Sequence, residues 1–134
     1  MIIKLTLILK ETWINLADNS SILWIRVFHL YGGFFRRFST AGYYVKGSIR
    51  VLKRQRRFFK GFRQKLFKKG SVRRIFLIRT VRAKTSNSTT TVSFTENTGS
   101  LIKKKNVFLS KHSLGPVVLG MRNKRLFSTF PVFC

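Results

Sequence analysis

The side chains that could perform acid–base catalysis are few in this chain of 134 residues. Its carboxylates are Glu11, Asp18 and Glu96, and its histidines are His29 and His112. General acid–base chemistry needs titratable groups placed together, and these five are scattered without a motif spacing. We therefore expect no catalytic residue and predict that the protein is not an enzyme.

The sequence also lacks recognisable motifs for binding a metal or a cofactor. Cys134 is the only cysteine, which excludes an intramolecular disulfide and a thiolate metal cluster. A zinc site would lack ligands at a recognisable spacing. The glycine-containing segments YGGFF and KKGSVRR do not fit a phosphate-binding loop motif. We expect no metal and no cofactor.

Two of the acids have simpler interpretations. Asp18, in the segment ADNSS, is typical of a turn residue whose carboxylate accepts backbone N–H bonds. Glu96, in FTENTG, is expected to pair with one of the many arginines.

Positive charge dominates the sequence. Lys and Arg number 28 against three acids, giving a net charge of +25. Because such charge repels itself, the compact state needs an external anion: nucleic acid, an anionic membrane or an acidic protein. The hydrophobic content of 44% is that of a globular protein, not of a disordered basic tail. We therefore predict a folded core with a cationic surface that binds nucleic acid.

The densest cationic segment is RQRRFFKGFRQKLFKKGSVRR, at 54–74, with ten Lys or Arg, four Phe and one Leu. Phe58, Phe59, Phe62 and Leu66 share one side of a helix, so a membrane-surface amphipathic helix is an alternative. In an RNA-bound ribbon, the cations contact phosphates and the aromatics pack on the barrel, on neighbouring proteins or on unstacked bases. The charge density here and elsewhere favours RNA.

Short strand-like runs must position these cations. The runs cover residues 3–9, 22–31, 43–52, 72–83, 89–94 and 99–110. The middle of 72–83 is almost continuously apolar, as in a strand buried on both faces. Gly, Asn and Ser separate the runs, which predicts a mainly β fold, a small antiparallel barrel. A short helix is expected over 113–127, with Pro116 in its first turn.

The chain is expected to form one domain over residues 1–134. We find no internal repeat and no interdomain linker. The apolar run at the N-terminus is broken by Lys4 and Lys10, so it is too short for a membrane span of roughly 20 residues. It also lacks a recognisable signal-peptide cleavage site.

Five segments resemble, in the same order, the pattern of the bacterial-type large-subunit ribosomal protein L-fourteen family. TWINLADNSS (12–21) is similar to T-x-L-x-V-A-D-N-S-G-A, and GGFFRRFSTAGYYVKGSIRV (32–51) to G-G-S-x-R-R-Y-A-x-x-G-D-x-I-x-x-x-V. KKGSVRRIFLIRT (68–80) resembles K-K-G-D-V-x-x-A-V-V-V-R-T. FTENTGSLI (94–102) resembles F-D-E-N-A-x-V-L-I, and LGPVVLGMR (114–122) resembles F-G-P-V-A-R-E-L-R.

The resemblance implies a five-stranded barrel with a projecting basic β-ribbon and short C-terminal helical segments. It covers a core of residues 12–122, with divergent extensions at both ends. It also implies a structural role on the subunit-joining face of the large ribosomal subunit. The expected partners are large-subunit rRNA, small-subunit rRNA across an intersubunit bridge, and neighbouring proteins of the L-three and L-nineteen families.

Carried over by position, Arg36 and Arg37 match the family's rRNA-facing Arg pair, and Lys68, Lys69, Arg79 and Thr80 match further shared positions. The residues expected to bind rRNA are Arg36, Arg37, Lys46, Arg50, Lys53, Arg54, Arg56, Arg57, Lys60, Arg63, Lys65, Lys68, Lys69, Arg73, Arg74, Arg79, Arg82, Lys103, Lys104 and Lys105.

The family's C-terminal surface also binds ribosome-silencing factors. Its Thr-Arg pair reads Lys111-His112 here, so the resemblance implies a silencing-factor surface in which the Arg donor geometry is lost.

Acids are missing where the family pattern has them. Tyr43, Ser71 and Thr95 replace aspartates, and Gly120 replaces a glutamate. Such drift, with heavy use of Phe, Ile and Lys, is typical of an AT-rich organellar genome. We therefore expect a mitochondrial ribosome, with a plastid ribosome as the weaker choice.

Overall fold

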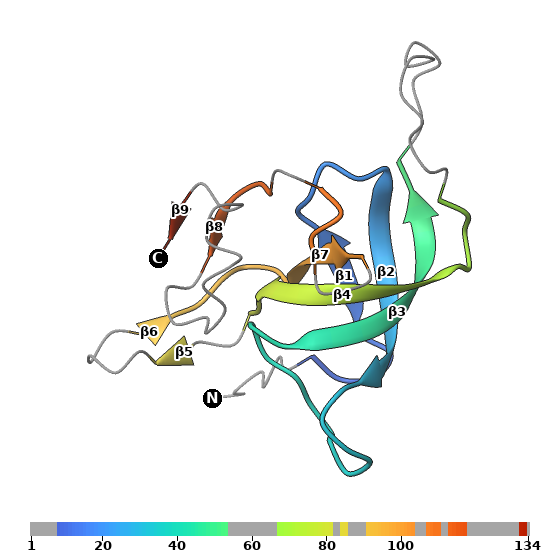
Figure 1. Cartoon of the computed structure of the whole chain (residues 1–134). Helices are drawn as coiled ribbons and strands as arrows, with labels where there is room; N and C mark the ends of the chain where they lie inside the picture. The colour runs from blue at the N-terminus through green and yellow to red at the C-terminus, as the bar shows by residue number, and fades with distance from the viewer. Residues whose placement is uncertain are drawn as a thin grey trace.

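The structure is a computed structural model (Figure 1), and the residues that it describes are 8–53, 67–81, 84–85, 91–103, 107–110, 113–117 and 132–133. These residues form strands and no helix. The barrel strands are β1 (Trp13–Leu16), β2 (Ile22–Leu30), β3 (Tyr44–Leu52), β4 (Val72–Arg79) and β7 (Thr98–Ile102). Two small sheets pair β5 (Lys84–Thr85) with β6 (Thr91–Val92), and β8 (Pro116–Val117) with β9 (Val132–Phe133).

The barrel closes in the order β1-β2-β3-β4-β7, which confirms the predicted small five-stranded β-barrel. Its neighbours are antiparallel except at the seam, where β1 and β7 run parallel and pair Asn15 with Thr98. The expectation of a wholly antiparallel barrel is corrected at this seam. Strand direction must alternate around an antiparallel ring, and an odd number of strands cannot close without one parallel pair.

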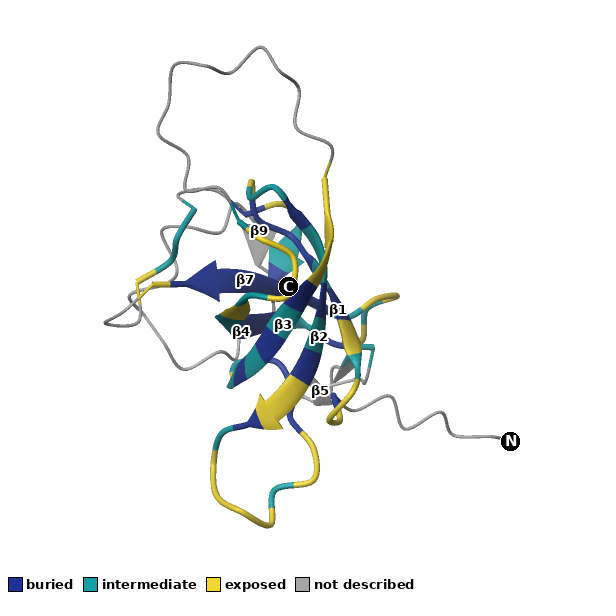
Figure 2. Ribbon diagram, turned by 90° about the vertical axis from the view of Figure 1, so that its right-hand side faces the viewer, coloured by how far each residue is buried: buried dark blue, intermediate teal, exposed yellow. Residues whose placement is uncertain are grey.

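The main core fills the barrel, and β3 contributes to it through regular alternation of buried and more exposed residues. In β3, Val45, Gly47 and Ile49 point inward and are buried, whereas Lys46 and Arg50 alternate with them. The banding of buried and intermediate residues along β3 is visible in Figure 2. In β3, one face therefore builds the core and leaves the other free for surface chemistry.

Strand β4 is buried on both faces, as its continuous apolar run predicts. Ile75 and Leu77 belong to the main core inside the barrel. Phe76 and Ile78 belong to a second core, which also contains Ile102 of β7 and Val117 of β8. The C-terminal part of the chain thus covers the outer side of β4.

The N-terminal boundary of the barrel differs from the expectation. The first barrel strand is Trp13–Leu16, which the strand-like runs did not include. Of the expected strand over residues 3–9, residues 3–7 lie outside the described part. Ile8 forms an isolated antiparallel bridge with Ser39 and is buried in the main core. Strand β1 escapes detection because only Ile14 and Leu16 mark its inward face.

The helix expected over 113–127 does not begin where the sequence places it. Pro116 and Val117 form strand β8, and residues 118–131 lie outside the described part of the chain. The segment is extended because it pairs with the barrel: Ser113 bridges to Asp18, and Leu114 N–H donates to the carbonyl of Ala17. Burial of Val117 then outweighs the local helix signals.

Candidate nucleic-acid interface

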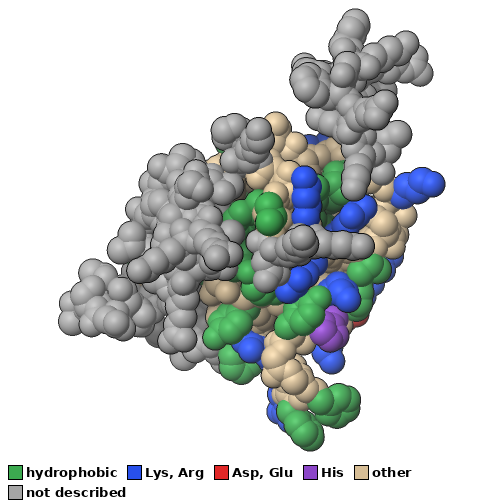
Figure 3. Space-filling model, in the orientation of Figure 1, with side chains coloured by type: hydrophobic (Ala, Val, Ile, Leu, Met, Phe, Trp, Pro, Cys, Tyr) green, Lys and Arg blue, Asp and Glu red, His purple; other side chains and the backbone are tan. Residues whose placement is uncertain are grey.

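A row of three basic side chains crosses the outer wall of the barrel. In the strand registers His29 of β2 lies beside Lys46 of β3, and Lys46 lies beside Arg74 of β4. Neighbouring strands are about 4.8 Å apart, so the three residues lie next to one another across the wall. Lys and Arg side chains gather over the face that Figure 3 shows. We call His29, Lys46 and Arg74 the wall row.

Aromatic rings hold the end of the wall row. The guanidinium carbon of Arg74 lies 4.9 Å from the ring centroid of Tyr44 and 5.3 Å from that of Tyr31. Tyr31 in turn makes an edge contact with His29, at 4.9 Å between ring centroids. The two tyrosines fix the planar cation through cation–π attraction. The contacts restrict the conformations of the Arg74 side chain, whose Nε is buried without a hydrogen-bond partner among the described residues.

None of the three acids of the chain neutralises this row. Glu11 forms a salt bridge with Arg26. Asp18 is 1% exposed and accepts hydrogen bonds from the backbone N–H groups of Ser20 and Leu101, as expected for a turn carboxylate. Glu96 accepts a long hydrogen bond, 3.5 Å, from Asn15. Like charges on facing strand positions destabilise a sheet, so an external anion at Lys46 and Arg74 would stabilise it.

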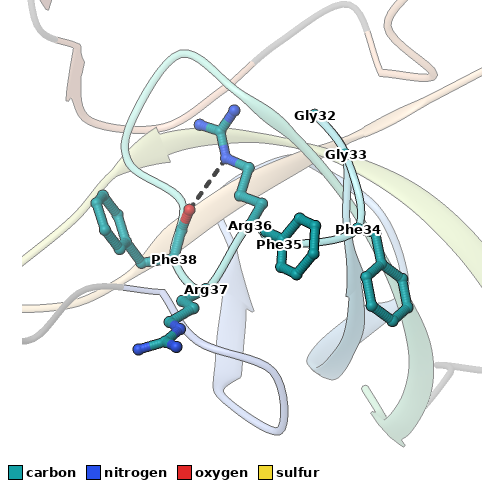
Figure 4. Close-up of a pocket in the computed structure, with 7 residues that line it drawn as sticks. All are labelled: Gly32, Gly33, Phe34, Phe35, Arg36, Arg37 and Phe38. Atoms are coloured by element: carbon teal, nitrogen blue, oxygen red, sulfur yellow. Dashed lines mark hydrogen bonds between the residues drawn. The ribbon is translucent and has the colours of Figure 1, made fainter.

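A second cationic site lies in the loop between β2 and β3. Gly32 and Gly33 begin this loop with φ angles of +111° and +107°, values that favour glycine. The guanidinium of Arg36 turns back into the loop, where Nε donates to the carbonyl oxygen of Phe38 over 3.1 Å (Figure 4). It also lies 4.3 Å from the ring centroid of Tyr43. We call residues 32–38 the Gly-Gly loop.

Arg37 points away from Arg36 and is exposed on the same side of the loop as Phe38, whereas the exposed rings of Phe34 and Phe35 lie on the other side (Figure 4). The Gly-Gly loop lines an open hollow of about 560 Å³. The loop thus combines one anchored guanidinium, one free guanidinium and accessible aromatic rings.

Comparison with known proteins assigns the chain to a family. The sequence profile described as Ribosomal protein L14p/L23e matches residues 7–131. The chain belongs to this family of ribosomal proteins. A similar protein, the large ribosomal subunit protein uL14m of Tetrahymena pyriformis, is 28% identical over 124 residues. The alignment covers 92% of this chain and 97% of that relative. The resemblance seen in the sequence is confirmed, and the protein is a structural component of the ribosome, not an enzyme.

Several residues expected to bind rRNA flank the segment 54–66. Arg50, Lys53, Lys68 and Lys69 are exposed where the chain leaves and re-enters the described barrel. Backbone bonds fix both ends of the segment: Lys53 N–H donates to Ser21 and Gly70 N–H donates to Ile49.

One aromatic of the basic stretch has a place in the fold. Phe67 packs against the main core, and the guanidinium carbon of Arg73 lies 5.0 Å from its ring centroid. For Phe67 the arrangement agrees with the barrel, one of the three sites expected for the aromatics of the stretch; Phe58, Phe59 and Phe62 lie outside the described part. Lys103 is exposed at the end of β7. The remaining expected site residues lie outside the described part: Arg54, Arg56, Arg57, Lys60, Arg63, Lys65, Arg82, Lys104, Lys105, Lys111 and His112.

Arg79 of the ribosomal protein is engaged within the fold. Its Nε donates to Thr98 Oγ1 over 2.8 Å, and its Nη1 donates to the carbonyl of Leu114 over 3.1 Å. Burial lowers the pKa of this guanidinium from its usual value, and the nearby charge of Glu96 opposes the shift. A Cβ atom on Gly115, whose φ is +90°, would lie 1.8 Å from Nη1. Arg79 therefore joins β4, β7 and the segment before β8.

Sequence reasoning missed the residues that complete the wall row. His29, Tyr31 and Tyr44 were not among the expected site residues, although each adjoins an apolar strand position. Their partners Lys46 and Arg74 lie on other strands, so only the register brings them together.

No helix of the described residues is long and apolar enough to cross a membrane.

Proposed function

We propose that this protein is a structural constituent of the large subunit of a mitochondrial ribosome and binds large-subunit rRNA through the barrel wall. The observation that carries the proposal is the facing pair Lys46 and Arg74, which lacks any neutralising acid. The name of the relative, uL14m, which is that of a mitochondrial member, supports the organelle. The replacement of the family's acidic residues and the heavy use of Phe, Ile and Lys also support an organellar origin.

The wall row suits a phosphate backbone. Lys46 supplies a compact point charge, and Arg74, held between Tyr31 and Tyr44, supplies a planar fork that can bind one phosphate through two donors. Contacts of this kind position a protein on RNA without reading its sequence. Binding is then steeply salt-dependent and tolerant of base identity.

The family resemblance supports further partners. We infer contacts with small-subunit rRNA across an intersubunit bridge and with neighbours of the L-three and L-nineteen families. The same resemblance supports a silencing-factor surface at Lys111 and His112. The loss of the Arg in that pair implies weaker docking or a co-adapted factor.

Sedimentation of tagged full-length protein from detergent-treated organelle extracts tests the proposal. We expect the protein to travel with the large subunit and to be released by rising salt. Lys46→Glu should reduce the bound fraction, because it places an acid in the wall row. Lys10→Glu is the matched control, since Lys10 is exposed in a turn outside the row and the change in net charge is the same.

Two results would oppose the proposal. Equal losses from both variants would mean that only net charge matters. Recovery of the protein in a lipid fraction, with none in the subunit, would favour the amphipathic membrane-surface alternative.

A further inference from the structure

The tip of the Gly-Gly loop exposes two neighbouring aromatic rings. Phe34 is 92% exposed and Phe35 is 89% exposed, more than any other large hydrophobic residue among those described. Their ring centroids lie 5.4 Å apart with an interplanar angle of 84°. Two exposed phenylalanine rings gain no burial free energy on folding, and neighbouring exposed apolar side chains mark interaction sites, so the pair is expected to have a partner that covers it.

The loop holds the rings out instead of folding them back. Its base is fixed by two backbone bonds between Ile8 and Ser39, of 3.1 and 2.8 Å. Above this base the Arg36 guanidinium fills the inner side of the loop through its bond to Phe38 and its contact with Tyr43. A Cβ on Gly32 would lie 2.5 Å from Arg36 Nη1, so glycine lets the guanidinium occupy that place. The inner side is thus closed to the two rings.

Charge around the tip selects the kind of partner. Arg36 and Arg37 follow the rings directly, and no acid occurs in the sequence between Asp18 and Glu96. A partner that covers Phe34 and Phe35 must therefore bring negative charge next to a flat or concave apolar surface. Unpaired RNA offers both, because each nucleotide joins a base with a π-face to a phosphate.

We propose that Phe34 and Phe35 stack on unpaired bases of an RNA segment whose phosphates are bound by Arg37 and by the outer edge of Arg36. The inference rests on the proposed rRNA-binding function and adds a stacking contact to it. The rings cannot enter a continuous duplex without unstacking it, so the tip distinguishes single-stranded from paired RNA. The competing partner is a neighbouring protein whose apolar pocket would receive the two rings. Such a pocket would leave Arg36 and Arg37 without a counter-charge.

The test uses full-length protein and two probes: a single-stranded RNA oligonucleotide carrying one 5-iodouridine, and the same strand annealed to its complement. Near-ultraviolet light joins iodouridine to an aromatic ring that stacks on it, and mass spectrometry locates the joined residue. We expect cross-links at Phe34 or Phe35 with the single strand and none with the duplex.

Substitutions separate stacking from apolar contact. Phe34→Leu with Phe35→Leu keeps the apolar character and removes both π-faces, so affinity for the single strand should fall roughly 5- to 100-fold. Its salt dependence should not change, because no phosphate contact is lost. Phe34→Tyr with Phe35→Tyr should restore the affinity. Trp13→Leu, which removes an exposed aromatic of β1, is the matched control and should leave it unchanged.

Each other outcome has a distinct meaning. If the wild-type protein binds neither probe in a salt-dependent way, the proposed function itself fails. If it binds RNA but the Leu pair is neutral, the stacking proposal is overturned and rRNA binding stands. Subunit incorporation that is lost with Phe34→Ala plus Phe35→Ala but kept with the Leu pair would assign the tip to a protein pocket and also overturn the proposal.

Discussion

Lys46 and Arg74 occupy directly opposite positions on the antiparallel strands β3 and β4, and both carry positive charge. His29 extends the row on β2. A free barrel has no reason to keep such a pairing, since an opposite-charge pair at the same positions would stabilise it. The pairing is what the proposed rRNA binding would favour, at the expense of the stability of the isolated protein.

Lys46→Gln should separate stability from binding. Removing one member of the like-charged pair should raise the stability of the free protein by about 0.2–1 kcal/mol at low salt. The same change should weaken RNA binding and lower the magnitude of the salt slope by about one phosphate equivalent. Thermal melts and a salt titration of RNA affinity measure the two effects.

Lys68→Gln is the control for the stability measurement. Lys68 is exposed just before the turn that leads into β4 and does not belong to the wall row. Its substitution should change stability by less than about 0.5 kcal/mol. A loss of stability in Lys46→Gln would contradict the repulsion argument.

Asp18 should be the most sensitive carboxylate for folding. Its Oδ2 accepts the backbone N–H of Leu101 over 2.9 Å, and its Oδ1 accepts the hydroxyl of Ser20 over 2.5 Å. Asp18→Ala leaves these buried donors without an acceptor and should destabilise the barrel by about 1–3 kcal/mol. Denaturant unfolding measures the loss. The exposed neighbour gives the control: Asn19→Ala should stay within about 0.5 kcal/mol of wild type.

Gly115 should be required for the internal position of Arg79. Gly115→Ala combines the strain of a positive φ, about 1–2 kcal/mol, with a collision against the guanidinium. Gly70 has a similar φ of +86° and no atom within 4 Å of a built Cβ, so Gly70→Ala should show the strain alone. The difference between their unfolding free energies measures the collision.

The Arg79→Ala background checks this interpretation. With the guanidinium gone, the excess cost of Gly115→Ala over Gly70→Ala should disappear. If the excess persists, the collision with Arg79 is not its cause.

The sequence was sufficient for the parts of the fold that rest on local pattern. The alternation in 43–52 and the apolar run in 72–83 correspond to β3 and β4, and the turn role of Asp18 is found as expected. The barrel seam and strand β8 depend on contacts between distant segments. Residues with short or conflicting local signals, such as Trp13–Leu16 and Pro116–Val117, take their structure from those contacts.

The candidate site shows the same division. Charge density indicated the cations of the wall, including Lys46 and Arg74, because composition is visible without a fold. The aromatic support from Tyr31 and Tyr44 depends on strand register and rotation, which a single sequence does not reveal. The internal role of Arg79 was missed for a related reason: its acceptors are Thr98 and a carbonyl far along the chain.

Arg74→Lys should show what the two tyrosines contribute. Lysine keeps the charge but loses the planar contact with Tyr31 and Tyr44 and the two-donor geometry toward a phosphate. We expect a loss of RNA affinity equivalent to about 0.5–2 kcal/mol, with little change in the salt slope because the number of cations is the same. Arg50→Lys, on the exposed end of β3, provides the matched control and should have a smaller effect. Fluorescence anisotropy with a labelled RNA over a range of salt concentrations measures both quantities. Equal losses from Arg74→Lys and Arg50→Lys would show that the tyrosines do not orient the guanidinium for binding, and the wall would then act through charge alone.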